Sequence, residues 1–408
     1  MTKKRISLIL SVFTILFILL TGCNETARQT DVTTYHVIGD GEKTVETIEK
    51  PDYADFYIPE GMVSAYGSNL LSPDEKRIYD KAKEDLGHFK EMVYLPTDAV
   101  TYTRILELIR FEELSFFPLK GRSIGDYDAG AGSFEVYFNY YSDNTTANDT
   151  MTRINMEIEA AAGEIMSDIT PDMTDYDKLK FFHDWLIKNC KTDDSSSTDI
   201  YSSTIYGTLI NRVALCEGYA KTFSYLCNLA GIENLIVSGT VNLPHMWNMV
   251  KLDGNWYHID VTYDFADENI LFSHPEFISY QYFLVSDAVI ENNHVIDRTV
   301  FEPPVANTMK ENYYIRERLT VFGDSVSDDV IAHALTEAVK DKRGYAVVKF
   351  DSTDLYLNAV NKISTAGGFD EINSKVVAET GEIALYSTSD YYSNYRILLF
   401  FIQYSNSD

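Results

Sequence analysis

The sequence predicts a protein of the α+β class, with a central core and a smaller α+β region on each side. The first observation is a helical pattern that begins at Cys216 and is followed by a short buried strand and a strand–turn–strand segment. The second is that helix and strand signals are mixed in residues 60–172 and again in residues 301–408. A length of 408 residues also exceeds one compact core and suffices for two or three domains.

Residues 1–22 predict a signal peptide. Lys3, Lys4 and Arg5 form a basic start, and residues 6–20 are mostly apolar, which is shorter than the ~20 residues that a membrane span needs. The following Leu20-Thr21-Gly22-Cys23 resembles the bacterial lipobox, which implies that Cys23 is lipidated and becomes the mature N-terminus. We therefore expect the protein to be lipid-anchored at the cell membrane of a Gram-positive bacterium, on the extracytoplasmic face. An uncleaved anchor helix is the alternative.

Residues 23–59 are predicted to be this lipidated cysteine and a flexible tether. The stretch from Asn24 to about Pro51 is rich in Thr and Glu and has little apolar periodicity.

The charge balance excludes one class of partner. The formal net charge is −28, and without the first 22 residues the chain has 31 basic against 62 acidic residues, a net charge of −31. A field of this sign repels phosphate backbones and anionic lipids, so no nucleic-acid partner is expected. The membrane is then a partner only through the lipid anchor, and we interpret the acidic excess as a means of keeping the surface soluble.

The cysteine pattern predicts neither a disulfide framework nor a metal site. The four cysteines are Cys23, Cys190, Cys216 and Cys227, and a Cys190–Cys227 bond stays an open alternative. The sequence contains no C-x-x-C pair and no H-E-x-x-H motif, so we expect no metal and no cofactor.

Residues 60–172 are predicted to form an N-terminal α+β region. Ser72-Pro73-Asp74-Glu75 has the form of a capping box and predicts a helix after it. Thr97 is predicted to cap a second helix, residues 134–141 to form a strand, and residues 151–169 to form a third helix.

Residues 301–408 are predicted to form a separate small α+β domain. It has no cysteine and a single histidine, His333, so it offers no obvious chemistry. Its expected elements are a helix from an N-cap at Ser327 to about Val339, a strand at 345–350, a helix at 356–363 and a strand at 395–402.

The predicted core, residues 173–300, opens with a helix capped by Thr174 and Asp177. His183 lies beside the apolar stripe of this helix, and we interpret it as a hydrogen-bonded structural residue rather than a catalytic one. Cys216 begins the next helical pattern, which Gly231 ends. The dipole and free amides of a helix N-terminus lower a thiol pKa and can hold an oxyanion, so Cys216 is the predicted nucleophile.

Asp253-Gly254 predicts a two-residue hairpin turn between the runs 245–252 and 255–262. In that register paired residue numbers sum to 507, so His245 and Asp260 are diagonal neighbours on one face, ~7–8 Å apart at Cα. A three-residue loop would break this relationship. The chemistry then assigns His245 as the general base and Asp260 as the residue that orients it.

Three sequence blocks resemble those of the bacterial transglutaminase-like superfamily. They are Cys216-Glu217-Gly218-Tyr219-Ala220, the segment from His245 to Asn248, and the segment from Trp256 to Tyr263. The helix containing His183-Asp184-Trp185-Leu186 is similar to the one that precedes the cysteine block in that superfamily, and the resemblance covers roughly residues 174–290. It implies a papain-like α+β core with a Cys216–His245–Asp260 triad. Met246 stands where Ala is commoner and Tyr263 where Trp is common, so the pocket can differ in shape. Tyr206 and Trp247 are the oxyanion or pocket candidates.

The sequence thus predicts an extracytoplasmic cysteine-dependent acyl-transfer enzyme. The favoured reaction is peptidase- or amidase-type hydrolysis of a protein or peptidoglycan-peptide substrate through a thioester. A protein-crosslinking transglutaminase is one alternative, because the acceptor depends on the access of water to the pocket. A non-catalytic surface binding module built on the same core is the other.

Overall fold

The computed structural model describes residues 60–87, 92–95, 98–114, 119–128, 133–140, 147–193, 201–265, 276–323, 325–389 and 395–404. The predictions for residues 1–59, including the signal peptide, Cys23 and the tether, lie outside these ranges. Within the described ranges, no helix combines the length and the apolar character needed to cross a membrane.

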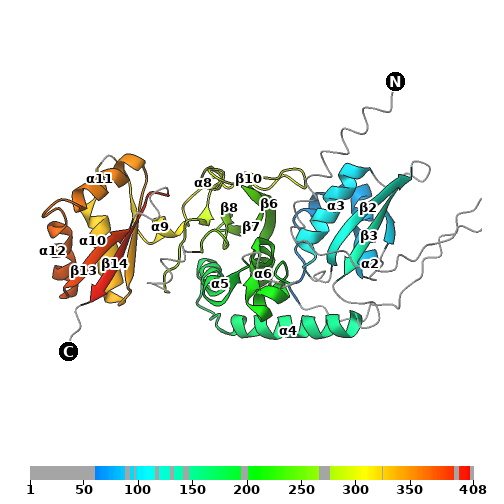
Figure 1. Cartoon of the computed structure of the whole chain (residues 1–408), viewed down its shortest axis with the longest axis horizontal. Coiled ribbons are helices and arrows are strands. Elements are labelled where there is room, and N and C mark those ends of the chain that lie inside the picture. The colour runs from blue at the N-terminus through cyan, green and yellow to red at the C-terminus, as the bar shows by residue number, and fades with distance from the viewer. Residues whose placement is uncertain are drawn as a thin grey trace, which may run out of the picture. The chain divides into compact units, whose positions relative to one another are not determined.

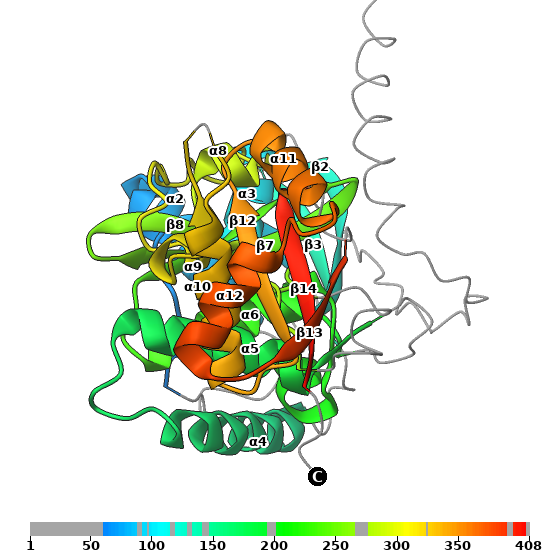
Figure 2. The same ribbon diagram turned by 90° about the vertical axis from the view of Figure 1, so that its left-hand side faces the viewer.

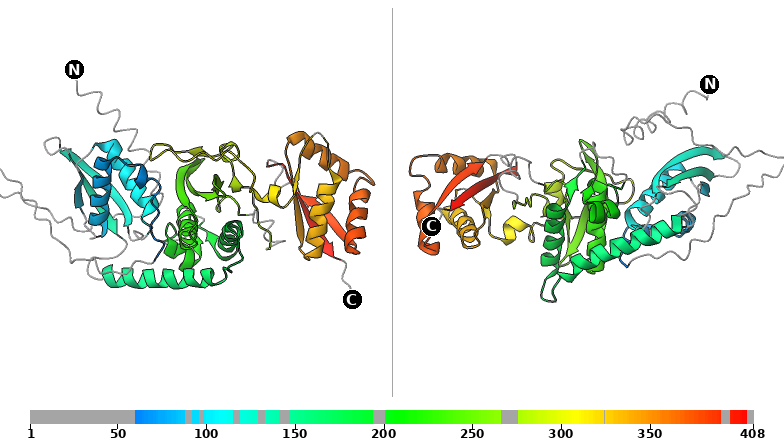
Figure 3. Two further views of the ribbon diagram at one scale, coloured as in Figure 1. Left: turned by 180° about the vertical axis from the view of Figure 1, so that it is seen from behind. Right: turned by 60° about the horizontal axis from the view of Figure 1, so that its bottom comes forward.

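The N-terminal region contains a three-stranded antiparallel sheet in the order β1-β3-β2. The predicted capping box is confirmed, because Ser72 and Glu75 bond reciprocally at the start of the first long helix. The prediction of Thr97 as the next cap was wrong by one residue: the Asp98 carboxylate accepts from the first-turn amides, and a carboxylate accepts two N–H bonds readily. The elements are η1 (Ser68–Leu70), α2 (Pro73–Gly87), β1 (Met92–Leu95), α3 (Ala99–Glu112), β2 (Leu119–Asp128), β3 (Ser133–Tyr140) and α4 (Ala147–Ser167). Figure 3 shows α4 from two sides as one uninterrupted helix.

The central region has the mixed helix-and-sheet architecture that a papain-like core requires (Figure 1). Its five-stranded antiparallel sheet has the order β10-β6-β7-β8-β9, and the predicted capping box of Thr174 and Asp177 is confirmed. The elements are α5 (Asp175–Asn189), β4 (Lys191–Thr192), η2 (Gly207–Asn211), β5 (Val213–Ala214), α6 (Cys216–Leu229), β6 (Asn234–Val241), β7 (Leu243–Leu252), β8 (Asn255–Ile259), β9 (Phe283–Val285), α8 (Asp287–Ile290) and β10 (Val295–Ile296).

The β7–β8 hairpin has the predicted register. Leu252 pairs with Asn255 and Asn248 with Ile259, so the turn contains two residues. Asp253 and Gly254 have φ values of 49° and 79°, the left-handed pair that matches the twist of the flanking strands. This turn fixes which face of the sheet His245 and Asp260 share.

The C-terminal region has a four-stranded sheet in the order β11-β12-β14-β13, in which β11 and β12 are parallel. Helices α10 and α12 lie side by side against this sheet (Figure 2). The strand predicted at 345–350 is confirmed at its exact bounds, and α12 and β13 were not predicted. The elements are α9 (Tyr313–Arg316), β11 (Thr320–Val321), α10 (Asp328–Lys340), β12 (Tyr345–Phe350), α11 (Thr353–Ile363), α12 (Asp370–Thr380), β13 (Ala384–Ser389) and β14 (Ile397–Tyr404).

Helix α6 is almost wholly buried after its first turn. Phe223 and Leu226 have no exposed surface, and each fully buried side chain of this size stabilises the fold by about 1.5–3 kcal/mol. The side-chain amide of Asn248 on β7 also donates to the carbonyl of Ala220, at 2.9 Å. These contacts hold the N-terminal end of α6 against the strand that carries His245.

Candidate active site

Cys216 is the first residue of α6, and its position is fixed by the residue before it. Leu215 adopts an extended conformation as the N-cap, and its amide donates to the carbonyl of Ser202 at 2.8 Å. Cys216 is partly exposed, whereas Cys190 and Cys227 are buried. All three thiols are free, so the open alternative of a Cys190–Cys227 disulfide is wrong.

Gly218 allows the start of α6 to pack closely against the preceding segment. A Cβ at this position would lie 2.3 Å from the carbonyl oxygen of Ser202 and 2.9 Å from the Thr208 hydroxyl. A side chain at position 218 would therefore collide with the preceding segment. The absence of one lets the Cys216 end of the helix lie close to that segment.

Glu217, next to Cys216, is held by two cations. Arg110 on α3 donates through Nε to one carboxylate oxygen at 2.7 Å and through a second nitrogen to the other, and Lys221 approaches at 2.9 Å. Burial alone would raise the pKa of Glu217, but Arg110 and Lys221 together hold it well below its usual range. Glu217 is thus an ionised anchor for the first turn of α6 and is not available as a general acid.

His245 on β7 and Asp260, directly after β8, form a short hydrogen bond. The distance from His245 Nε2 to Asp260 Oδ2 is 2.7 Å, and both side chains are buried. The Cys216 side chain is also close enough to the His245 ring to affect its pKa. Burial alone would lower the pKa of His245, but Asp260 and, to a lesser extent, Cys216 raise it to about 10. The three predicted catalytic residues therefore meet at one place.

Aromatic rings fix the orientation of the His245 imidazole. Trp247 stacks on it with ring centroids 5.9 Å apart, and Tyr263 meets it edge-on at 5.0 Å. The backbone amide of Tyr263 donates to the second Asp260 oxygen at 3.2 Å. These contacts hold the imidazole and the carboxylate in the orientation that their hydrogen bond requires.

His294, which the sequence reasoning missed, completes the surroundings of Asp260. Its Nε2 lies 2.9 Å from the same Oδ2 atom that His245 meets, and its ring is fully buried. Burial alone would raise the pKa of Asp260, but the imidazoles of His245 and His294 hold it well below its usual range. No local sequence motif marks His294, because its partner lies 34 residues earlier in the chain.

These three side chains are also of the types that bind metal ions. His245, Asp260 and His294 each place one ligand atom within 4.8 Å of the others. The nitrogen–oxygen distances of 2.7 and 2.9 Å are, however, hydrogen-bond lengths. Ligand atoms ~2.0–2.1 Å from a tetrahedral zinc ion are separated by about 3.3 Å. We therefore interpret the group as a hydrogen-bonded triplet.

Two other histidines near the core are committed to structural partners. His183 lies between the carboxylates of Asp184 and Asp264, 3.1 Å from each, as its structural interpretation requires. His258 accepts from the Trp247 indole at 3.0 Å through Nδ1, so its Nε2 carries the proton that Asp287 accepts at 2.8 Å. Neither ring therefore competes with His245 as the base for Cys216.

Tyr206 and Trp247, the predicted oxyanion or pocket candidates, use their donors elsewhere. The Tyr206 hydroxyl donates to Glu157 on α4 at 2.9 Å, and the Trp247 indole donates to His258. Trp247 therefore contributes a ring face beside His245 rather than a hydrogen bond to substrate. The first-turn amides of α6, beginning with that of Cys216, are the donors that a helix N-terminus leaves without intrahelical partners.

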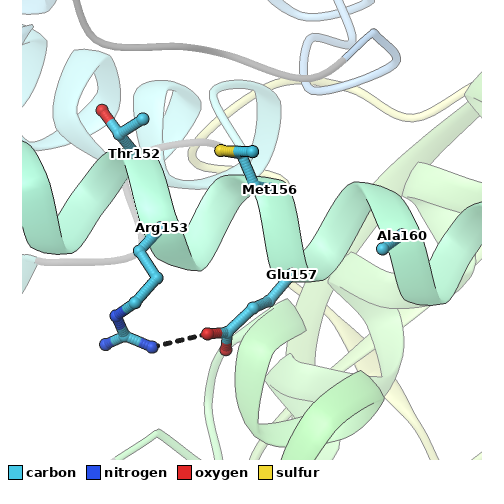
Figure 4. Close-up of a pocket in the computed structure, with 5 residues that line it drawn as sticks. All are labelled: Thr152, Arg153, Met156, Glu157 and Ala160. Carbon is cyan, nitrogen blue, oxygen red and sulfur yellow. Dashed lines mark hydrogen bonds and ion pairs between the residues drawn. The ribbon is translucent and has the colours of Figure 1, made fainter.

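A shallow depression on α4 contains none of the predicted catalytic residues. Its lining comes from one helix and includes Arg153 and Glu157, which form an ion pair at 2.7 Å (Figure 4). Glu157 also accepts a hydrogen bond from Tyr206, so the charged side chains of this depression are paired with neighbouring residues.

Residues 162–261 match the family model of the transglutaminase-like superfamily. The matched span contains Cys216, His245 and Asp260 and ends one residue beyond the last of them. The chain therefore contains a transglutaminase-like superfamily domain, with the α+β fold expected from its sequence.

Kyphoscoliosis peptidase of Homo sapiens is 24% identical to this chain over an alignment of 222 residues, and the match covers 48% of this chain and 32% of that protein. Kyphoscoliosis peptidase of Mus musculus is 22% identical over 219 residues, with the same coverage. The chain thus spans about a third of the length of these curated relatives, at 32% of each.

Two solved structures show weak overall similarity. A TGase has 16% identity and a TM-score of 0.24, covering 42% of this chain and 50% of its own. A candidate cysteine protease from Cytophaga hutchinsonii has 15% identity and a TM-score of 0.24, covering 44% of this chain and 65% of its own.

Proposed function

We propose that this chain is a cysteine-dependent acyl-transfer enzyme that hydrolyses amide bonds in a protein or a cell-wall peptide. The observation that carries the proposal is the His245–Asp260 hydrogen bond of 2.7 Å, with a partly exposed Cys216 close enough to the same imidazole to affect its pKa. A nucleophile, a base and the group that orients the base are thereby brought together.

In the first step His245 accepts the proton of the Cys216 thiol. The raised pKa of His245, about 10, favours the imidazolium and with it the thiolate form of Cys216. The thiolate adds to the amide carbonyl carbon, and the amides at the start of α6 stabilise the oxyanion. When the C–N bond breaks, the His245 imidazolium gives its proton to the departing amine, and a thioester on Cys216 remains.

In the second step a nucleophile removes the acyl group. Water gives up a proton to His245 as its oxygen adds to the thioester carbon; the C–S bond then breaks and Cys216 recovers a proton. The products are a carboxylic acid and the free enzyme. Asp260 takes no proton in either step; it stabilises the imidazolium and fixes its orientation.

We further propose that the enzyme acts outside the cell, anchored through Cys23. The lipobox-like Leu20-Thr21-Gly22-Cys23 and the basic start before it support this location. A substrate at the cell surface, either a protein or the peptide part of peptidoglycan, is consistent with such a position.

Water rather than an amine is the proposed acceptor, and the peptidase named in the similar human and mouse proteins, kyphoscoliosis peptidase, supports this choice. A direct comparison tests it. The protein lacking residues 1–22 is incubated with casein or with purified muropeptides, with and without the fluorescent amine dansylcadaverine. We expect new peptide termini, detected by mass spectrometry, and little amine incorporation. Efficient fluorescence incorporation without cleavage would instead show a transglutaminase.

Variants at Cys216 and His245 separate catalysis from binding. Cys216→Ser and His245→Ala should each abolish product formation, and the double variant should be no worse than Cys216→Ser, because the residues act as one unit. Melting temperature is the control for folding. Product formation that survives Cys216→Ser would contradict the proposal and favour a binding module.

A further inference from the structure

We propose that His294 is a positioning residue of the active site, which holds the Asp260 carboxylate through the same oxygen that His245 contacts. The proposal rests on the proposed cysteine mechanism and adds a fourth residue to it. The observation is that two imidazoles meet one carboxylate oxygen: Asp260 Oδ2 lies 2.7 Å from His245 Nε2 and 2.9 Å from His294 Nε2. All three side chains are buried, so bulk water does not compete for these bonds.

The direction of the His294 bond follows from its partners. Asp260 is ionised and can only accept, so His294 Nε2 must carry the hydrogen. The other nitrogen, Nδ1, lies 2.8 Å from the side-chain oxygen of Asn293, whose amide nitrogen donates to the Tyr282 hydroxyl at 2.8 Å. An imidazolium satisfies this arrangement, and a neutral ring satisfies it if the Asn293 amide is turned over. In both cases Nε2–H donates to Asp260.

The backbone brings His294 to Asp260 through a close strand contact. His294 immediately precedes β10, whose Ile296 pairs with Gly239 on β6, and Gly239 in turn pairs with His245. A Cβ at position 239 would lie 2.1 Å from the carbonyl oxygen of Val295 and 2.9 Å from the Trp247 ring. The missing side chain at Gly239 thus permits β10 to approach, and this approach places His294.

The three donors to Asp260 come from three different elements. His245 lies on β7, His294 lies before β10, and the amide of Tyr263 follows β8 and binds the other oxygen, Oδ1, at 3.2 Å. Removing His294 leaves Oδ2 with a single partner and allows the carboxylate to rotate. Since His245 is oriented by that carboxylate, the effect reaches the imidazole that lies near Cys216.

Few charged groups face His294 apart from Asp260. The His245 ring centroid lies 5.7 Å away, and the rings of Tyr263, Tyr282 and Trp247 lie 5.0–5.3 Å away. A charge on His294 lowers the pKa of His258. A change in pH dependence after substitution of His294 is therefore assigned to the His245–Asp260 pair by comparison with a substitution of His258.

The test is the rate of alkylation of Cys216 by iodoacetamide, which needs no substrate. The rate constant is measured by mass spectrometry from pH 4 to pH 10, for the wild type, His294→Leu and His294→Gln. Misplacing a catalytic group by ~1 Å can reduce a rate roughly 10²-fold, so partial loosening in His294→Leu should slow alkylation about tenfold at pH 7. The acid limb of its profile should also move to higher pH, because Asp260 loses a donor that stabilises its charge. His294→Gln places an N–H near the position of His294 Nε2. This variant should therefore restore both the alkylation rate at pH 7 and the pH of the acid limb.

His258→Gln is the matched control, since it also removes a buried histidine but one without contact to Asp260. It should lower the melting temperature and leave the acid limb where it is. A wild-type Cys216 that reacts no faster than a cysteine of the unfolded chain would contradict the proposed function itself. A reactive wild type with an unchanged His294→Leu profile, or a His258→Gln profile that shifts equally, would overturn the role of His294 alone.

Discussion

Arg110 on α3 and Glu217 on α6 form a two-point ion pair that connects the N-terminal region to the residue beside Cys216. The two residues lie 107 positions apart in the sequence. The first turn of the helix that carries the nucleophile is therefore held from outside the matched family span of residues 162–261. This gives the N-terminal region a physical role in the proposed activity.

Arg110→Ala should destabilise the fold. Breaking a fully buried ion pair costs about 3–5 kcal/mol, and we expect roughly 2 kcal/mol because Arg110 is 32% exposed and Lys221 remains beside Glu217. Urea denaturation measures the change. The double variant Arg110→Ala with Glu217→Gln should recover part of the loss, since position 217 then has no buried negative charge that lacks Arg110. An Arg110→Ala protein as stable as the wild type would show that the pair contributes nothing.

Gly218→Ala should destabilise the fold by about 1–3 kcal/mol, because the new Cβ would collide with the backbone of Ser202 at 2.3 Å. Gly163→Ala in α4 is the matched control: it is also a helical glycine, but nothing lies within 4 Å of its Cβ position. That change should stabilise the protein by up to ~1 kcal/mol through helix propensity. Thermal melting of the two variants should therefore shift in opposite directions, and equal shifts would refute the steric argument.

Asp260→Asn should lower the pKa of His245, which Asp260 helps to raise to about 10. In the wild type the imidazolium form of His245 should be lost as the pH rises through about 10. The stability that its bond to Asp260 contributes should be fully present below the ordinary histidine pKa of ~6.5 and should be lost as the pH rises through about 10. NMR titration of ¹³C-labelled histidine measures this directly. In Asp260→Asn the His245 resonance should titrate at least one unit lower, because a neutral amide cannot stabilise the imidazolium charge. An unchanged titration would mean that Asp260 does not control His245.

Cys23→Ala should release the protein from the membrane. The proposed anchor is the acyl group on this sulfur, and a single change removes the attachment point. Metabolic labelling with a fatty acid should disappear together with membrane retention. Labelling that persists in the variant would contradict the lipoprotein proposal.

Local sequence rules predicted the elements of the site well. Thr174 and Asp177 form the predicted capping box, and Asp253-Gly254 forms the predicted two-residue turn. That turn sets the side-chain alternation of β7 and β8, and Asp260 directly follows their paired segment, so the turn favours the proximity of His245 and Asp260. Short-range signals of this kind depend on a few adjacent residues and are readable without tertiary structure.

The parts that could not be predicted depend on long-range pairing. His294 reaches Asp260 because the two-residue strand β10 pairs with β6, and two residues are too few to carry a strand signal. Arg110 and Glu217 have no sequence pattern in common. Helix α12 was missed because its N-cap, Phe369, makes no side-chain capping bond and only Ile372 and Val376 are buried.

The central claim is that His245 activates Cys216, and the reactivity of the three described thiols tests it most directly. Burial raises the pKa of Cys190 to about 11 and raises that of Cys227 well above its usual range, and both are buried, whereas Cys216 is partly exposed. Each cysteine is quantified by mass spectrometry after brief exposure of the native protein to iodoacetamide at pH 7. We predict rapid modification of Cys216 alone in the wild type, and a loss of that selectivity in His245→Ala at a temperature where thermal melting shows that the variant is folded. Equal, slow reaction of all three cysteines, or a Cys216 rate that His245→Ala leaves unchanged, would contradict the account.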